Sequence, residues 1–218
     1  MADVILRLHI ASKAFGARPV LGAIDLELGA REIVAIVGKS GCGKTTLLHI
    51  AGGLERDFDG RLEWPGGRVP RIGTVFQEPR LLPWRSVREN LRLAQETPDD
   101  SRADALLDTL GLLQFADFYP GTLSLGMARR VAIARAFAVA PELVLLDEPF
   151  VSLDPDMAAH SRDLVLAAWR ATPTAMLLVT HDRKEAESMA DRILVLGGEP
   201  ARITAQIGVT ASGATGRR

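Results

Sequence analysis

The sequence has few of the features that would point to a secreted, membrane-spanning or nucleic-acid-binding protein. A single cysteine, Cys42, among 218 residues excludes an internal disulfide. No apolar run approaches the roughly 20 residues that a spanning helix needs, and Asp3 and Arg7 stand where a secretory leader would be apolar. The 26 basic and 27 acidic side chains leave a net charge of −1, so no overall field favours nucleic acid. We expect a cytoplasmic protein that binds no nucleic acid and meets a membrane only through a partner.

The composition does support a substantial hydrophobic core. Hydrophobic residues make up 47 % of the chain, which is enough for one globular domain with a smaller lobe. We expect this single domain to span residues 1–209 and the end, residues 210–218, to be a disordered tail.

The pattern of apolar residues predicts an α/β fold. Alternation at Leu6, Leu8 and Ile10, and again over residues 24–28, indicates an antiparallel β lobe at the N-terminus, with turn residues around Gly16 and Pro19. Residues 57–60 are predicted to form a turn between short strands. Helical spacing then predicts an inserted helical lobe over about residues 86–140, with one of its helices over 127–138. The remaining apolar segments are of strand length and alternate with helical segments, which favours a mainly parallel sheet covered by helices; they span residues 32–37, 72–76, 143–146 and 175–179. A final hairpin is predicted for 193–196 and 203–207.

A glycine-rich segment follows the first of these apolar strands and precedes a helical segment. It fits the phosphate-binding pattern G-x-x-x-x-G-K-[ST] in the required order of strand, loop and helix. Backbone N–H groups of such a loop and the helix N-terminus hold a β-phosphate, while Lys44 reaches the β and γ oxygens and Thr45 offers a hydroxyl to Mg²⁺. The predicted nucleotide-binding residues are Gly38, Lys39, Ser40, Gly41, Cys42, Gly43, Lys44, Thr45 and Thr46. Cys42 fits there as a small structural residue, although a thiol near a helix N-terminus can also be reactive.

Polar residues also follow three other predicted strands. Asp147 and Glu148 end the apolar run 143–146, at the kind of strand end where open α/β sheets bind ligands. We expect Asp147 to hold Mg²⁺ and Glu148 to accept a proton from the attacking water. Gln77 ends the strand 72–76 and His181 follows Thr180; the glutamine can contact the metal and the water, and the imidazole the γ-phosphate.

Taken together and in this order, the motifs resemble those of the nucleotide-binding subunit of an ATP-binding cassette (ABC) transporter, over nearly the whole chain. The resemblance includes a signature-like segment, residues 123–127, and the triplet Ser152-Leu153-Asp154. It implies a P-loop NTPase core of the ABC ATPase type that hydrolyses ATP with Mg²⁺. It also implies that Phe15 stacks on adenine, and that Ser124 and Gly126 of one subunit close on the γ-phosphate held by a second subunit.

The signature departs from the usual L-S-G-G-Q at Leu125 and Met127. If position 125 needs a positive φ, leucine there would be strained by about 1–3 kcal/mol. Two hypotheses follow, a slower ATPase with normal nucleotide binding and a heterodimer with a subunit that carries the usual signature.

The segment after Gln77, residues 78–90, is similar to that of the nitrate, sulfonate and taurine importer subfamily, and similar segments also occur in pyrimidine-precursor importers. This likeness implies transmembrane permease subunits and, indirectly, a solute-binding protein as partners, on the inner face of the cell membrane. An exposed Pro83-Trp84 would anchor the permease, whereas a buried Trp84 would be a core residue. The alternatives are a soluble ABC-type ATPase and a weakly hydrolysing ATP-dependent interaction module.

Overall fold

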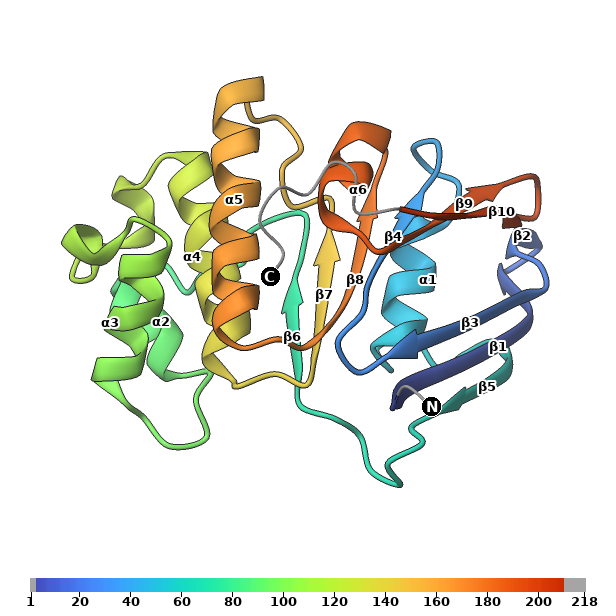
Figure 1. Cartoon of the computed structure of the whole chain (residues 1–218), viewed down its shortest axis with the longest axis horizontal. Helices are drawn as coiled ribbons and strands as arrows, with labels where there is room; N and C mark the ends of the chain where they lie inside the picture. Colours follow the sequence, from blue (N-terminus) through green and yellow to red (C-terminus); the bar gives the residue numbers. More distant parts are fainter. Residues whose placement is uncertain (1–2, 210–218) are drawn as a thin grey trace. The chain divides into compact units, whose positions relative to one another are not determined.

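The computed structural model describes residues 3–209, and the chain divides into two compact units. The split unit combines residues 3–70 with 175–209, and the inserted unit comprises residues 71–174. Both are built of strands and helices (Figure 1). The α/β fold predicted from the sequence is confirmed.

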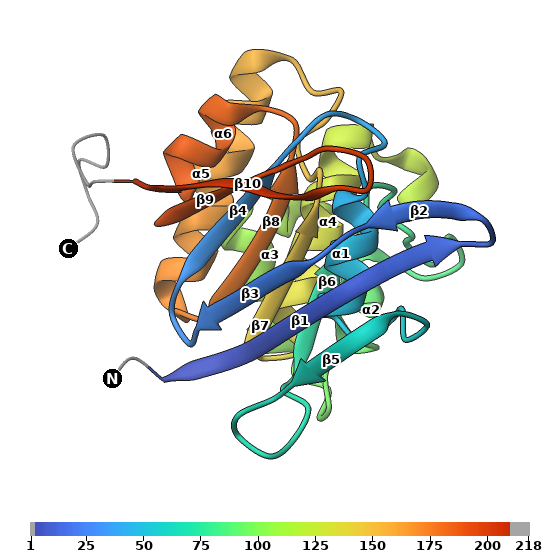
Figure 2. The ribbon, with the colours of Figure 1, turned by 90° about the vertical axis from the view of Figure 1, so that its right-hand side faces the viewer.

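An antiparallel sheet opens the split unit. Its central strand, β1 (Val4–Phe15), pairs with β2 (Arg18–Leu21), β3 (Ile24–Gly29) and β5 (Asp59–Glu63). Figure 2 shows β1 between β3 and β5. Alternate residues of β1 are buried, because one face of the sheet packs on the core. The pairing of β1 with β2 shifts register between Lys13 and Ala14, close to the end of the strand.

The parallel strands of the split unit are β4 (Ile33–Val37), β8 (Ala175–Thr180) and β9 (Arg192–Gly197), with β4 in the middle. Strand β10 (Arg202–Gly208) runs antiparallel beside β9, which confirms the predicted hairpin. Helix α1 (Lys44–Ala51) packs against β8, and α6 (Arg183–Met189) against β4. Strand β8 is buried along its whole length, as expected for a parallel strand that is covered on both faces.

The inserted unit holds the parallel pair β6 (Ile72–Val75) and β7 (Leu143–Asp147). Its helices are α2 (Val87–Arg92), α3 (Asp100–Thr109), α4 (Leu125–Ala138) and α5 (Pro155–Ala171), with 3-10 turns at Leu113–Phe115 and Pro120–Thr122. Helix α4 contacts the other three helices and β6, so it is the centre of this unit.

Three details differ from the sequence-based expectations. Pro19 lies in strand β2 rather than in a turn, at an edge of the sheet where its missing N–H is tolerated. Strand β5 begins at Asp59, where a turn was predicted, and helix α4 begins at Leu125 instead of Met127. The predicted tail, 210–218, lies outside the described residues. Among the described helices, none is both long and apolar enough to cross a membrane.

Candidate active site

The predicted site residues fall into two sets, one in each unit. The phosphate-binding loop, Phe15 and His181 belong to the split unit. Gln77, Ser124, Gly126, Asp147, Glu148 and Asp154 belong to the inserted unit.

The phosphate-binding loop, residues 38–45, links β4 to α1. Gly41 and Gly43 have φ values of +76° and +101°, a region that disfavours side chains. A Cβ atom on Gly43 would also lie 2.7 Å from Leu21 Cδ2. Gly43 caps α1 without a side-chain hydrogen bond to the first turn, so no side chain of the cap competes with an anion for the helix N–H groups. This backbone fits a phosphate group.

Lys44 is buried at the first position of α1. Its ammonium group donates to the carbonyl oxygens of Gly38, at 2.9 Å, and Lys39, at 3.0 Å, and so spans the loop from within. Thr45 and Ser40 are exposed, whereas Cys42 and Thr46 are partly buried. The lysine therefore brings a positive charge to the same loop whose backbone is shaped for phosphate.

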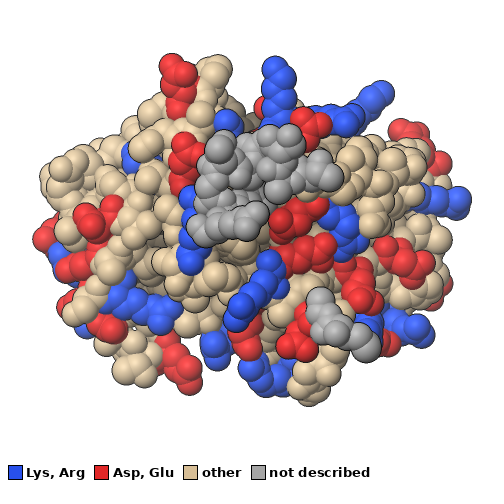
Figure 3. Space-filling view, viewed as in Figure 1, with Lys and Arg blue, Asp and Glu red and all other residues tan. Residues whose placement is uncertain are grey.

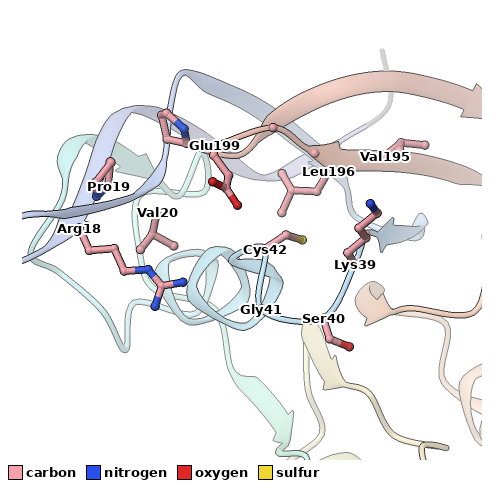
Figure 4. A pocket seen from close by; sticks show the side chains of 14 residues that line it. Arg18, Pro19, Val20, Lys39, Ser40, Gly41, Cys42, Val195, Leu196 and Glu199 are labelled. Carbon is pink, nitrogen blue, oxygen red and sulfur yellow. The ribbon is translucent and has the colours of Figure 1, made fainter.

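A cavity of about 900 Å³ borders the first half of the loop. Strand β2 lines it with Arg18 and Val20, and the β9–β10 turn lines it with Glu199. In Figure 4 the side chains of Cys42 and Glu199 point into this space, whereas Ser40 points away from it. The residues that line the cavity do not include Phe15, Lys44 or Thr45. The candidate site is therefore the phosphate-binding loop together with this cavity, and not the cavity alone.

His181 follows β8 and is exposed. Strands β4 and β8 are parallel, with Val37 opposite Thr180, so the phosphate-binding loop and His181 leave the sheet at the same edge. The next residue, Asp182, caps α6 by accepting hydrogen bonds from Lys184 N and Glu185 N. The structure thus brings His181 to the edge of the sheet at which the phosphate-binding loop begins.

Gln77 and the two acids share an edge of the β6–β7 pair. Val75 lies opposite Leu146, and both strands point the same way, so Gln77, Asp147 and Glu148 follow from the same end. Asp147 is buried, with 4 % exposure, and Gln77 is exposed. Glu148 has a φ of +43°, which is unusual for a residue other than glycine and is associated with functional positions. No sequence pattern indicated this conformation.

The signature-like segment lies at the N-terminus of α4. Ser124 caps the helix by accepting from Met127 N at 3.3 Å, and Leu125 is the first helical residue. Leu125 is not among the residues with positive φ, so the condition under which leucine would be strained at this position is not met. The reason is the serine cap, which lets the helix begin at residue 125 with ordinary right-handed geometry.

Gly126 joins this segment to the start of α5. A Cβ atom on Gly126 would lie 3.3 Å from Met157 Cε and 3.4 Å from Leu153 Cδ2. Asp154 caps α5 by accepting from Met157 N at 3.0 Å. The structure therefore brings Ser124, Gly126 and Asp154 into one cluster of two helix N-termini.

The predicted metal ligands offer oxygen atoms of three kinds, a hydroxyl at Thr45, an amide at Gln77 and a carboxylate at Asp147. Oxygen donors of this type suit Mg²⁺, which keeps several waters and substrate oxygens in its shell. Within residues 3–209, no group of three or more histidine, cysteine, aspartate and glutamate side chains forms a metal cage. Each of these donors, taken by itself, is of the kind that magnesium binds together with phosphate oxygens.

Two further residues near the site were not identified from the sequence. Lys13 on β1 places its ammonium group 4.4 Å from the centre of the Phe15 ring. Arg135 on α4 donates to the carbonyl oxygens of Pro79, at 3.0 Å, and Arg80, at 2.8 Å, in the loop after Gln77. Lys13 precedes Phe15 by two residues, which was the only available signal, since residues i and i+2 of a strand share a face.

Known proteins resemble this chain in sequence and in fold. The model of the ABC transporter family matches residues 21–151. An aliphatic sulfonates import ATP-binding protein of Xanthomonas axonopodis pv. citri is 46 % identical over 214 residues, covering 93 % of this chain and 85 % of the relative. A protein of the same name from Nocardia farcinica is 47 % identical over 192 residues, covering 88 % and 76 %. The dimeric post-hydrolysis structure of an ATP-binding cassette bound to ADP and Pi has a TM-score of 0.81 at 26 % identity, covering 94 % of this chain and 99 % of that one.

Proposed function

Because the chain belongs to the ABC transporter family, as the ATP-hydrolysing subunit of an importer, we propose that it powers the uptake of an aliphatic sulfonate. The observation that carries the choice of solute is the 46 % identity to a sulfonate import subunit over 93 % of the chain. The likeness of residues 78–90 to the nitrate, sulfonate and taurine importers supports the same class of small anion.

The split unit would hold the nucleotide. Phe15 stacks on adenine, the N–H groups of residues 38–45 bind the phosphates, and Lys44 neutralises the β and γ oxygens. His181 donates a hydrogen bond to the γ-phosphate and so responds to its loss. The support for these roles is the left-handed Gly41 and Gly43 and the buried Lys44.

The inserted unit would supply the groups for hydrolysis. Glu148 accepts the proton of the attacking water, and Gln77 orients that water. Thr45, Gln77 and Asp147 would hold Mg²⁺, which when bound draws charge from the phosphate oxygens. The positive φ of Glu148 supports its role, because such backbone strain of about 1–3 kcal/mol persists at functional positions.

A second ATPase subunit would complete each site with Ser124, Gly126 and Asp154, and ATP binding would close the pair. The permease would dock on Pro83-Trp84. Trp84 is 69 % exposed, which excludes the core interpretation of this residue and supports an anchor. With a permease and, indirectly, a solute-binding protein as partners, the chain would work in the cytoplasm at the inner face of the membrane.

The proposed partners do not include nucleic acid. On the described part of the face in Figure 3, acidic and basic side chains are interspersed. An interface with nucleic acid would instead need a continuous basic surface.

Complementation of a bacterial strain that lacks its own alkanesulfonate import ATPase tests the solute. We expect the chain to restore growth on an alkanesulfonate as the sole sulfur source, and the Glu148→Gln variant to fail. Growth on sulfate controls for toxicity. Restored uptake of nitrate without that of alkanesulfonates would contradict the proposed solute and keep the importer function.

A further inference from the structure

Lys13 is the most deeply buried charged side chain near the candidate site, with 1 % of its side chain exposed. It lies on β1, two residues before Phe15. Lysine is almost never buried to this extent unless its charge is paired. Its environment should therefore show what the charge is used for.

Three oxygen atoms of the segment after α1 hold the ammonium group. Lys13 donates to the backbone carbonyl of Asp57, and its Nζ lies 3.2 Å from Asp57 Oδ2 and 3.3 Å from Glu55 Oε2. The N–H of Asp57 donates to Glu55 Oε1 at 2.8 Å, and this bond, followed by the contact with Lys13, lowers the pKa of Glu55. Glu55 is therefore an anion at neutral pH, and its carboxylate lies beside the ammonium group of Lys13.

The fourth contact of the ammonium group is aromatic. Nζ lies 4.4 Å from the centre of the Phe15 ring, within the range of a cation–π interaction. Because Nζ is buried, the ring face above it is covered by protein. Phe15 as a whole is nevertheless 52 % exposed, so its accessible surface is on the side away from Lys13.

We propose that Lys13 is a positioning residue for the nucleobase, because it holds the Phe15 ring with one face covered and the other open for stacking. This inference rests on the proposed role of Phe15 as the surface that adenine contacts. Phe15 ends β1, where the register with β2 shifts, so neighbouring strand pairs restrain it less than they restrain the middle of the strand. The fixed cation replaces that restraint and reduces the freedom that the ring would lose on binding.

The test compares ligands with and without a base. We measure dissociation constants of ATP and of inorganic tripolyphosphate for the full chain and for the Lys13→Met, Lys13→Gln and Phe15→Leu variants. Loss of Lys13 should weaken ATP about five- to thirty-fold, the range of a partly desolvated cation–π pair, and leave tripolyphosphate within twofold. In the Phe15→Leu background, loss of Lys13 should weaken ATP no further.

Controls separate this role from a general effect on folding. The Lys13→Gln variant keeps a hydrogen-bond donor for the Asp57 carbonyl. It replaces Lys13→Met in the binding measurement if Lys13→Met unfolds below the assay temperature. Asp57→Asn removes one carboxylate at an exposed position, keeps the cation, and should preserve the preference for ATP.

Equal weakening of ATP and tripolyphosphate, or additive losses in the double variant, would overturn the inference and leave the base-stacking role intact. If Phe15→Leu bound ATP as tightly as the full chain, the stacking role itself would fail, and the inference with it.

Discussion

A Cβ atom built on Gly73 would lie 2.1 Å from the carbonyl oxygen of Ala136, so strand β6 and helix α4 meet backbone to backbone. The same helix carries Ser124 at its N-terminus and Arg135 near its C-terminus, and β6 leads to Gln77. Gly73 therefore allows the loop after Gln77 and the signature-like segment to be parts of one packed unit.

Gly73→Ala tests this close approach. The added methyl group forces β6 and α4 apart, and we expect a loss of about 1–3 kcal/mol in the free energy of unfolding. Denaturant titration measures it. Gly66→Ala is the matched control, because nothing lies within 4 Å of its Cβ position. Equal stability of the two variants would contradict the close contact.

Glu148→Gln tests the proposed general base. We expect ATP turnover to fall at least about 100-fold, while ATP binding persists and light scattering detects an ATP-trapped dimer. Glu96→Gln, an exposed change outside the site, should retain turnover. If Glu148→Gln hydrolysed ATP at the original rate, another group would have to accept the proton.

Removal of magnesium tests the oxygen-donor set. With EDTA we expect hydrolysis to stop, and readdition of Mg²⁺ to restore it. In Thr45→Ala the Mg²⁺ concentration for half-maximal turnover should rise about 10-fold or more. Thr109→Ala, whose hydroxyl bonds Ala105 O within α3, should leave that concentration unchanged. The proposed ligand role of Thr45 is lost if both variants behave alike.

Leu125→Gly tests the absence of strain at the signature. Because Leu125 is a helical residue with ordinary φ, glycine should lower the free energy of unfolding, by up to about 1 kcal/mol. Thermal melting of Leu125→Gly is compared with that of Ala128→Gly, a variant on the same helix that shows the effect of glycine alone. An increase in stability would mean that Leu125 is strained after all. If Leu125 is unstrained and the ATPase is nevertheless slow, the Met127→Gln variant tests whether Met127 is the cause.

Trp84→Ala tests the permease anchor. We expect co-purification with the permease to be lost while the basal ATPase rate of the isolated chain is kept. Val69→Ala removes another exposed apolar side chain, in the split unit, and should not affect co-purification.

The buried side chain of Asn90 holds the backbone on both sides of Trp84. It accepts a hydrogen bond from Leu82 N at 2.8 Å and donates one to Ser86 O at 2.9 Å. The Asn90→Ala variant should therefore also co-purify less with the permease. Retention of the permease by Trp84→Ala would place the anchor elsewhere.

Much of the fold and of the candidate site was predictable, because the relevant patterns are local. Gly41 and Gly43 have a backbone conformation that only glycine adopts easily. Asp147 is the last residue of an otherwise apolar strand, and Glu148 follows it. Two of the predictions that were wrong depend on how strands pair, which the residue pattern of one segment does not show. Pro19 belongs to an edge strand because it pairs with Ala14 of β1, and β5 begins at Asp59 because that residue pairs with Ser12 of β1.

The sequence by itself determined the family, the phosphate-binding loop and the residues at the strand ends, since contiguous residues specify each of these motifs. Only the tertiary structure decided that Lys13 lies under Phe15, that Gly73 meets Ala136, and that Leu125 is unstrained. The physical reason is that Lys13 is positioned by carboxylates more than 40 residues away, and that Gly73 packs against Ala136, which is more than 60 residues further along the chain. Contacts over such separations depend on packing, which residue patterns along the chain do not encode.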